Sequence, residues 1–153
     1  MKNILYLGLL ILGTLSRSYA QKTNAKYDHL LADSLGADNY GMKYYSFVLL
    51  KTGTTKITDK DSVNRLFDGH MKNIQRLAKE KKLIVAGPFG KNERDYRGIF
   101  ILNVKTIKEA EALLATDPAI KAGLLISEIT LWYGSAALPL YLEASEKVNK
   151  FEF

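Results

Sequence analysis

His70 is the side chain of this sequence whose setting most invites a chemical explanation. It lies on the apolar stripe of an expected helix, three residues after Phe67 and four before Ile74, so the three side chains share one helix face. A histidine on a buried face costs desolvation free energy unless a partner satisfies it. Two interpretations stay open: a core histidine that bonds a backbone carbonyl, or a functional acid or base in a cleft, oriented by a carboxylate.

Asp117 is the carboxylate that the expected topology places best for such a pairing. It ends a second expected helix, just before Pro118, and that helix should pack beside the helix of His70 on the same face of a sheet. Asp117 could instead only terminate its helix before a proline, although the helix macrodipole disfavours an aspartate at a C-terminus. Spacing alone does not pair the two residues, because many other acidic residues could compete.

Metal and cofactor chemistry find no support in the sequence. His29 and His70 are the only histidines, they are far apart, and the chain has no cysteine, so a metal-ligand cluster is not expected. The segment "GPFG" (87–90) is too short for a phosphate loop and is not followed by a helix. No hydroxyl nucleophile stands in a G-x-S-x-G setting. We therefore predict neither a metal nor a cofactor.

The charge of the chain does not indicate a nucleic-acid partner. Lys and Arg number 22 against 16 Asp and Glu, a net charge of +6. The charged segments "KEKK" (79–82) and "KNERDYR" (91–97) mix both signs, whereas a nucleic-acid surface needs a basic patch. We expect no nucleic acid to bind.

The elements that must position these residues follow from hydrophobic periodicity and turn residues. Strands are expected at residues 43–51, 83–87, 98–104 and 124–133. Helices are expected from a cap at Thr58, Asp59 or Asp61 to about Lys82, and from Thr106 to Thr116. The resulting order, strand–helix–strand–strand–helix–strand, predicts an α+β, ferredoxin-like fold with a four-stranded antiparallel sheet.

Two of the expected strands are apolar on both faces. In "YYSFVLL" (44–50), Phe47 and Leu49 face one side, and Val48 and Leu50 face the other; "IFILNV" (99–104) behaves in the same way. Strands that are apolar on both sides belong to sheets that are covered on both faces. One chain supplies only two long helices, which can cover one face. We therefore expect a homodimer that packs sheet against sheet. Alternatively, a terminal helix of the same chain could fold over the bare face.

The two ends of the chain differ from the middle. Residues 1–20 combine Lys2, an apolar run and Ser18-Tyr19-Ala20, the pattern of a cleaved signal peptide, although an uncleaved membrane anchor is the alternative. Export to the periplasm or secretion follows, with no stable membrane insertion after cleavage. Residues 21–42 should form an extension with one short helix, residues 43–134 the folded domain, and residues 135–153 a tail.

Two segments together resemble the YCII-related (YciI-like) domain family. They are "GHMKNIQRLAKEKKLIVAGPF" (69–89) and "GIFILNVKTIKEAEALLATDPAIKAGLL" (98–125), and the flanking sequence is similar to an exported subgroup. The resemblance implies a ferredoxin-like domain that dimerises into an α+β barrel. It also implies an active site made from the family's histidine and the aspartate of its Asp-Pro motif, here His70 and Asp117.

Two functional hypotheses follow. The first is an enzyme that uses the His70–Asp117 dyad for general acid–base chemistry on a small organic molecule, by isomerisation, elimination or hydrolysis. The second is a non-catalytic periplasmic dimer that binds a small ligand or a partner protein. The geometry of the site is the first observation that distinguishes these hypotheses. The enzyme requires the His70 and Asp117 side chains within hydrogen-bond reach of each other and open to a cavity.

Overall fold

A computed structural model describes residues 24–150 of the chain. The signal peptide expected over residues 1–20 lies outside the described residues, as do the first residues of the extension and the last three of the tail. No helix in the described part is both long and apolar enough to cross a membrane.

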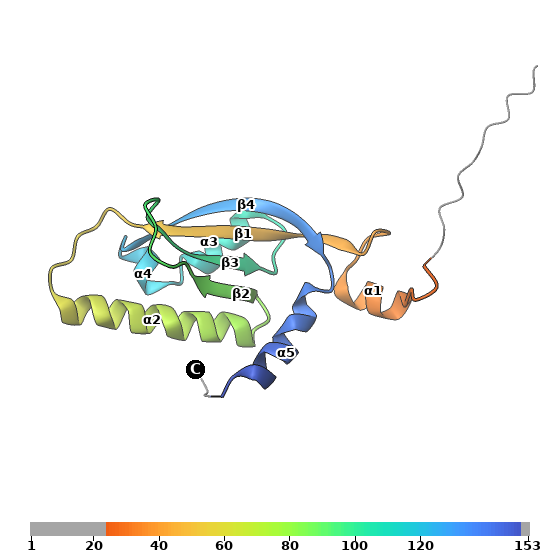
Figure 1. Ribbon diagram of the computed structural model, residues 1–153. Helices are drawn as coiled ribbons and strands as arrows, with labels where there is room; N and C mark the ends of the chain where they lie inside the picture. The colour runs from red at the N-terminus through yellow and green to blue at the C-terminus, as the bar shows by residue number, and fades with distance from the viewer. Residues whose placement is uncertain (1–23, 151–153) are drawn as a thin grey trace, which may run out of the picture.

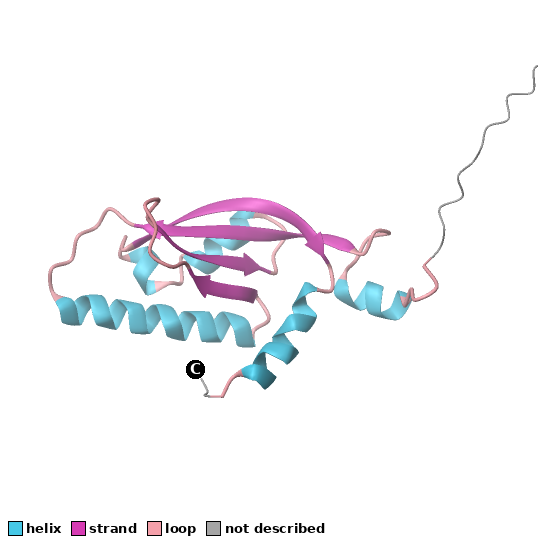
Figure 2. Cartoon of the chain, in the orientation of Figure 1, coloured by secondary structure: helices cyan, strands magenta, loops and turns pink. Residues whose placement is uncertain are grey.

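The central element is one sheet of four antiparallel strands (Figures 1 and 2). They are β1 (Met42–Thr52), β2 (Leu83–Pro88), β3 (Tyr96–Leu102) and β4 (Leu125–Ser135), in the spatial order β2-β3-β1-β4. Helices α2 (Lys60–Lys79), α3 (Ile107–Leu114) and α4 (Pro118–Lys121) cover one face. This is the predicted ferredoxin-like arrangement. The third strand starts and ends two residues earlier than expected.

Local signals in the sequence determine where the helices begin. The Asp59 side chain accepts a hydrogen bond from the Ser62 N–H at the start of α2. Thr106 caps α3 with a reciprocal bond from Glu109, a complete capping box, which satisfies two N–H groups that the helix leaves free. Asp59 is one of the three cap residues expected for the first long helix. Thr106 is the cap expected for the second.

Two further helices lie near the ends of the described chain. The short helix expected in the extension is α1 (His29–Leu35), which ends at Gly36 in the left-handed conformation, φ 68°. The tail forms a 3-10 turn, η1 (Leu138–Leu140), and α5 (Tyr141–Val148). Figure 1 shows α1 beyond one end of the sheet and α5 on the same side as α2. Neither helix lies over the opposite face of the sheet.

The hydrophobic core lies between the sheet and α2, α3 and α4. Its strand residues share one parity: Val48 and Leu50 of β1 are buried, as are Phe100 and Leu102 of β3. The helices, the first residues of β2 and β4, and the segment after β3 supply the rest, including Leu77, Leu83, Val104, Ala110, Leu114, Ala119 and Leu125. The opposite parity forms the helix-free face.

Helices α2 and α4 approach each other closely at Gly69. A Cβ atom built on Gly69 would lie 2.8 Å from the Pro118 Cγ, closer than real carbon contacts. Only a glycine lets the two helices meet here without displacement. Because the neighbouring residues are His70 on α2 and Asp117 at the start of α4, this contact sets the distance between them.

We predict that Gly69→Ala destabilises the protein. Helix propensity favours alanine over glycine by about 1 kcal/mol, whereas overpacking costs about 1–3 kcal/mol, so the clash should win. Urea unfolding measures the difference. Lys72→Ala, on the exposed side of α2, is the control and should change stability by less than about 0.5 kcal/mol. A more stable Gly69→Ala protein would contradict the tight contact.

Candidate active site

The two residues singled out in the sequence meet in the structure. The His70 Nδ1 lies 2.7 Å from the Asp117 Oδ2, although 47 positions separate them in the chain. Asp117 is fully buried, whereas 11% of the His70 side chain is exposed. His70 is therefore bonded to a carboxylate and not to a backbone carbonyl as the core interpretation supposed.

Asp117 holds a different place from the one its sequence suggested. Helix α3 already ends at Leu114, and Asp117 is the N-cap of α4 instead of the last residue of a longer helix. Its Oδ1 accepts hydrogen bonds from the Ala119 N–H at 2.9 Å and the Ile120 N–H at 3.2 Å. A carboxylate is favoured at a helix N-terminus by these donors and by the helix dipole.

The charge of Asp117 decides the tautomer of His70. Burial works to raise the pKa of Asp117, but the hydrogen bond and charge of His70, with the bonds from Ile120 and Asn73, outweigh it and lower the pKa below the usual 3.8. Asp117 is therefore ionised at neutral pH and can only accept hydrogen bonds. The proton between the two residues consequently belongs to the His70 Nδ1.

Asn73, one turn after His70 on α2, also bonds the carboxylate directly. The Asn73 Nδ2 donates to the Asp117 Oδ2 at 3.3 Å, while the Asn73 Oδ1 accepts from Arg76 at 2.8 Å and from Thr116 at 3.0 Å. These contacts orient the Asn73 amide. Sequence reasoning missed Asn73, although a polar residue three positions after His70 on the buried stripe was the signal available.

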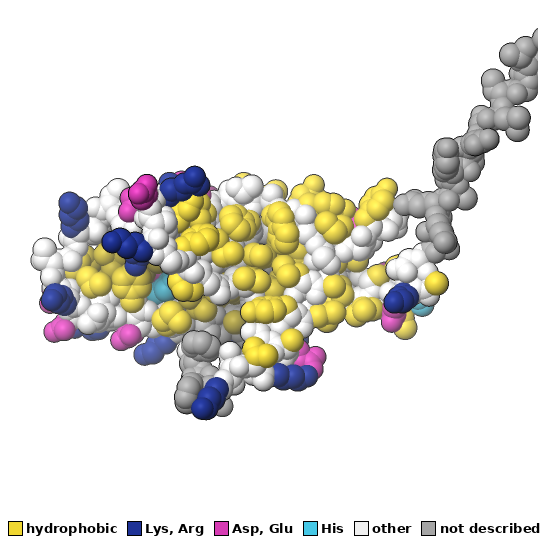
Figure 3. All heavy atoms as spheres, viewed as in Figure 1, with side chains coloured by type: hydrophobic (Ala, Val, Ile, Leu, Met, Phe, Trp, Pro, Cys, Tyr) yellow, Lys and Arg dark blue, Asp and Glu magenta, His cyan; other side chains and the backbone are white. Residues whose placement is uncertain are grey.

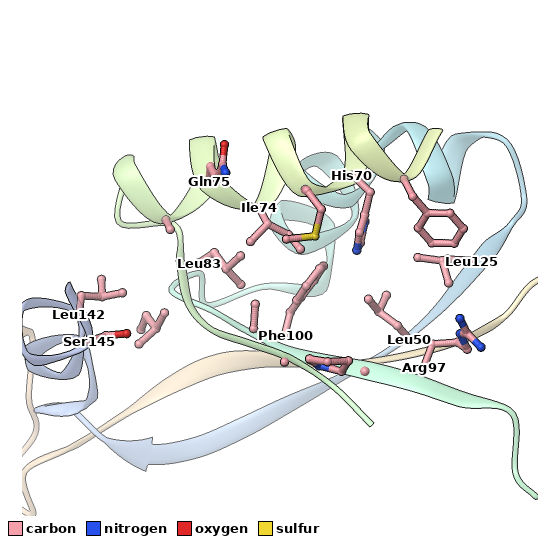
Figure 4. Close-up of a pocket in the computed structure, with 18 of the residues that line it drawn as sticks. Leu50, His70, Ile74, Gln75, Leu83, Arg97, Phe100, Leu125, Leu142 and Ser145 are labelled. Carbon is pink, nitrogen blue, oxygen red and sulfur yellow. The ribbon is translucent and has the colours of Figure 1, made fainter. Parts of the chain in front are cut away.

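A cavity of about 710 Å³ opens beside His70, between α2, β2, β3 and α5. Its walls are mainly apolar, with Phe67, Ile74 and Leu83 among them. In the close-up of Figure 4 the His70 ring extends from α2 into this space, toward the sheet. Figure 3 shows hydrophobic side chains gathered over this side of the molecule.

The free nitrogen of His70 faces the cavity. The His70 Nε2 has no hydrogen-bond partner in the described part of the chain, and no side-chain nitrogen or oxygen there is both sealed and unpaired. The Nε2 must therefore be accessible. Two aromatic rings flank the imidazole: Phe100 stacks on it at 6.0 Å between ring centroids, and Phe67 meets it edge-on at 6.1 Å.

The His70–Asp117 pair can transfer protons with its own side chains. The described residues contain no group of three or more His, Cys, Asp or Glu side chains that could hold a metal ion. What they contain is a buried ionised carboxylate, an imidazole that it orients, and an accessible ring nitrogen beside apolar walls. An imidazole held in this way can act as a general base or a general acid.

Comparison with solved structures and protein families supplies the context. 5-Chloro-2-hydroxyhydroquinone dehydrochlorinase from Burkholderia phenoliruptrix, solved with 2,5-dihydroxybenzoquinone, is similar over 57% of this chain and 92% of its own, with 20% identity and a TM-score of 0.40. No curated protein matches.

The model of one family, the YCII-related domain, matches residues 45–133, from β1 almost to the end of β4. The match includes the whole of α2, α3 and α4 and both residues of the His70–Asp117 pair. The chain belongs to the YCII-related domain family.

Proposed function

We propose that the protein is an enzyme that performs general acid–base chemistry on a small organic molecule in the cavity beside His70. One observation carries the proposal: the His70 Nδ1 is held by ionised Asp117 while the opposite nitrogen opens onto an apolar cavity. A histidine that served only packing would have no need of a free nitrogen beside an open cavity.

The chemistry follows from the state of the ring. With its proton on Nδ1, the neutral imidazole presents a lone pair on Nε2, which accepts a proton from a bound molecule. The resulting imidazolium is stabilised by Asp117, and Nε2 can return the proton at another atom. Isomerisation, elimination and hydrolysis all use such a transfer, and a positioned acid or base contributes about 10²- to 10⁴-fold in rate.

The helix-free face of the sheet supports a homodimer. Phe47, Leu49, Ile99 and Ile101 are half-buried there, and Ile126 and Trp132 are 40% and 39% exposed on the same face. Neither α1 nor α5 covers it (Figure 1). This face is mainly apolar, although it also carries Thr130 and the Lys51–Glu128 ion pair. An exposed apolar patch marks an interaction site, and a second copy would cover it symmetrically. We propose that the exported protein, without residues 1–20, is this dimer in the periplasm or outside the cell.

A non-catalytic ligand-binding dimer would use the same cavity. The two functions differ in what happens to the bound molecule: an enzyme converts it, whereas a binding module returns it unchanged. A thermal-shift screen of small organic compounds finds ligands for either, because a ligand at 100 times its dissociation constant adds about 2.7 kcal/mol. Product analysis of each hit then separates them.

We predict that His70→Gln abolishes conversion of any substrate found in this way, with a loss of about 10²-fold or more, while the protein stays folded. His29→Gln is the matched control, because His29 is the other histidine and is exposed on α1. Turnover and urea unfolding are measured on both variants. A His70→Gln protein that unfolds easily while the folded fraction keeps its turnover would make His70 architectural.

We also predict that Asp117 stabilises the fold above its own pKa. Because that pKa is lowered in the folded protein, the ionised carboxylate adds stability above the unfolded-state value, and this is lost as pH falls through the folded-state value. The free energy of unfolding of wild type should therefore exceed that of Asp117→Asn above the ordinary value of 3.8, and the difference should narrow as pH falls below that value. Urea unfolding over a pH series tests this; a difference that widens as pH falls below 3.8 would contradict it.

The dimer has its own test. We expect wild type to sediment as a dimer at micromolar concentration and Phe47→Glu to sediment as a monomer, because the substitution buries an unpaired charge in the interface. Lys108→Glu, at an exposed position of α3, adds an acidic residue elsewhere and should leave the dimer intact. Wild-type protein that is monomeric throughout would refute the assembly.

A further inference from the structure

Arg97 is placed on the cavity by an irregularity in the sheet. Leu50 of β1 pairs with Gly98 of β3, but the next residue, Lys51, pairs with Tyr96. Arg97 is thus an extra residue with no partner in β1, a β-bulge. Strict alternation from Ile99 would send its side chain to the helix-free face. Bulges re-aim side chains next to functional sites, and Arg97 lines the cavity of His70 instead.

No acidic side chain of the described residues pairs with the charge of Arg97. Among the residues that the structure describes, those that line the cavity include no aspartate or glutamate. Within residues 24–150 the Arg97 guanidinium forms neither a hydrogen bond nor an ion pair with another side chain. An arginine keeps its positive charge and presents donors in a fork that matches a carboxylate. Arg97 is therefore the cavity's one permanent charge among the residues described.

Arg97 also stands where two hollows adjoin. A smaller cavity of about 210 Å³ shares Phe67, Arg97 and Leu125 with the larger one. In Figure 4 Arg97 lies at the end of the large cavity away from Leu142 and Ser145 of α5, with Phe100 between and His70 above. A bound molecule that touched Arg97 with one end would lay its body against the apolar wall below the imidazole.

We propose that Arg97 determines substrate class by binding the carboxylate of a small molecule whose apolar or aromatic body lies beside His70. This rests on the proposed function, because it assigns the recognition group of the same cavity. Three features point to it together: the bulge that turns the side chain toward the cavity, the absence of acidic residues from the cavity lining within residues 24–150, and the apolar walls that suit a body without charges. Arg97 is exposed as well as on the cavity lining, so its guanidinium is open to a ligand that enters from solvent.

Matched acids and amides test the proposal, because each pair differs in charge and little in shape. The probes are benzoate with benzamide and phenylacetate with phenylacetamide. Their binding is measured by calorimetric titration and placed by the ring signals of His70, which His29→Gln leaves as the only histidine signals of the protein. The background His29→Gln protein is compared with versions that also carry Arg97→Gln or Arg94→Gln. Arg94 is an exposed arginine three positions away that does not line the cavity.

We expect the acids to bind the background protein at least about tenfold more tightly than their amides, a difference of about 1.4 kcal/mol. Arg97→Gln should remove this preference by weakening the acids alone, and Arg94→Gln should retain it. Equal acid binding in Arg97→Gln and the background protein would overturn the proposal, as would the failure of both acids to bind.

The outcomes also separate this inference from the proposed function. If acids and amides perturb the His70 signals equally with and without Arg97, the carboxylate site is wrong while the cavity beside His70 stands. If the acids bind through Arg97 but leave the His70 signals unchanged, Arg97 serves a separate site and the proposed link to His70 is overturned. Loss of turnover in His70→Gln is judged independently of either result.

Discussion

The buried carboxylate of Asp117 is the interaction on which the rest of the site depends. A charge in the protein interior must be paired and fully hydrogen-bonded, and Asp117 achieves this with four partners: His70, Asn73, and the N–H groups of Ala119 and Ile120. Two of these belong to α2 and two to α4. Satisfying one carboxylate therefore ties together the two helices that frame the site, with Gly69 allowing them to approach closely enough.

The same bonds give His70 a defined chemical role to play. An imidazole on an apolar stripe would otherwise be free to rotate or to seek a backbone partner. Here ionised Asp117 accepts a hydrogen bond from the His70 Nδ1–H, and Phe67 and Phe100 restrict the ring. The other ring nitrogen, Nε2, faces the cavity. Structural and chemical demands coincide at Asp117, since the group that caps α4 also orients the acid–base residue.

The sheet divides the molecule into two surfaces with different tasks. Under α2, the side chains of one parity form the core and the inner wall of the cavity, among them Leu50 and Phe100. The other parity forms a mainly apolar face without helices, which also carries the Lys51–Glu128 ion pair. The bulge at Arg97 is the local exception to this alternation, because it brings a charged side chain to the cavity side. A sheet of perfect register would have placed that charge in the face proposed for dimerisation.

The sequence by itself determined the element types, their order and most of their ends, because caps such as Asp59 and Thr106, the turn at Gly36 and hydrophobic periods are local properties of the chain. It also singled out His70, whose polarity conflicts with its stripe, while Asp117 needed the family resemblance as well. Only the tertiary structure decided that Asp117 caps α4, that Asn73 supports it, and which strand parity faces the helices. Pairing across 47 positions depends on helix packing, and a single extra residue in β3 reverses the direction of Arg97, so neither is written in any local pattern.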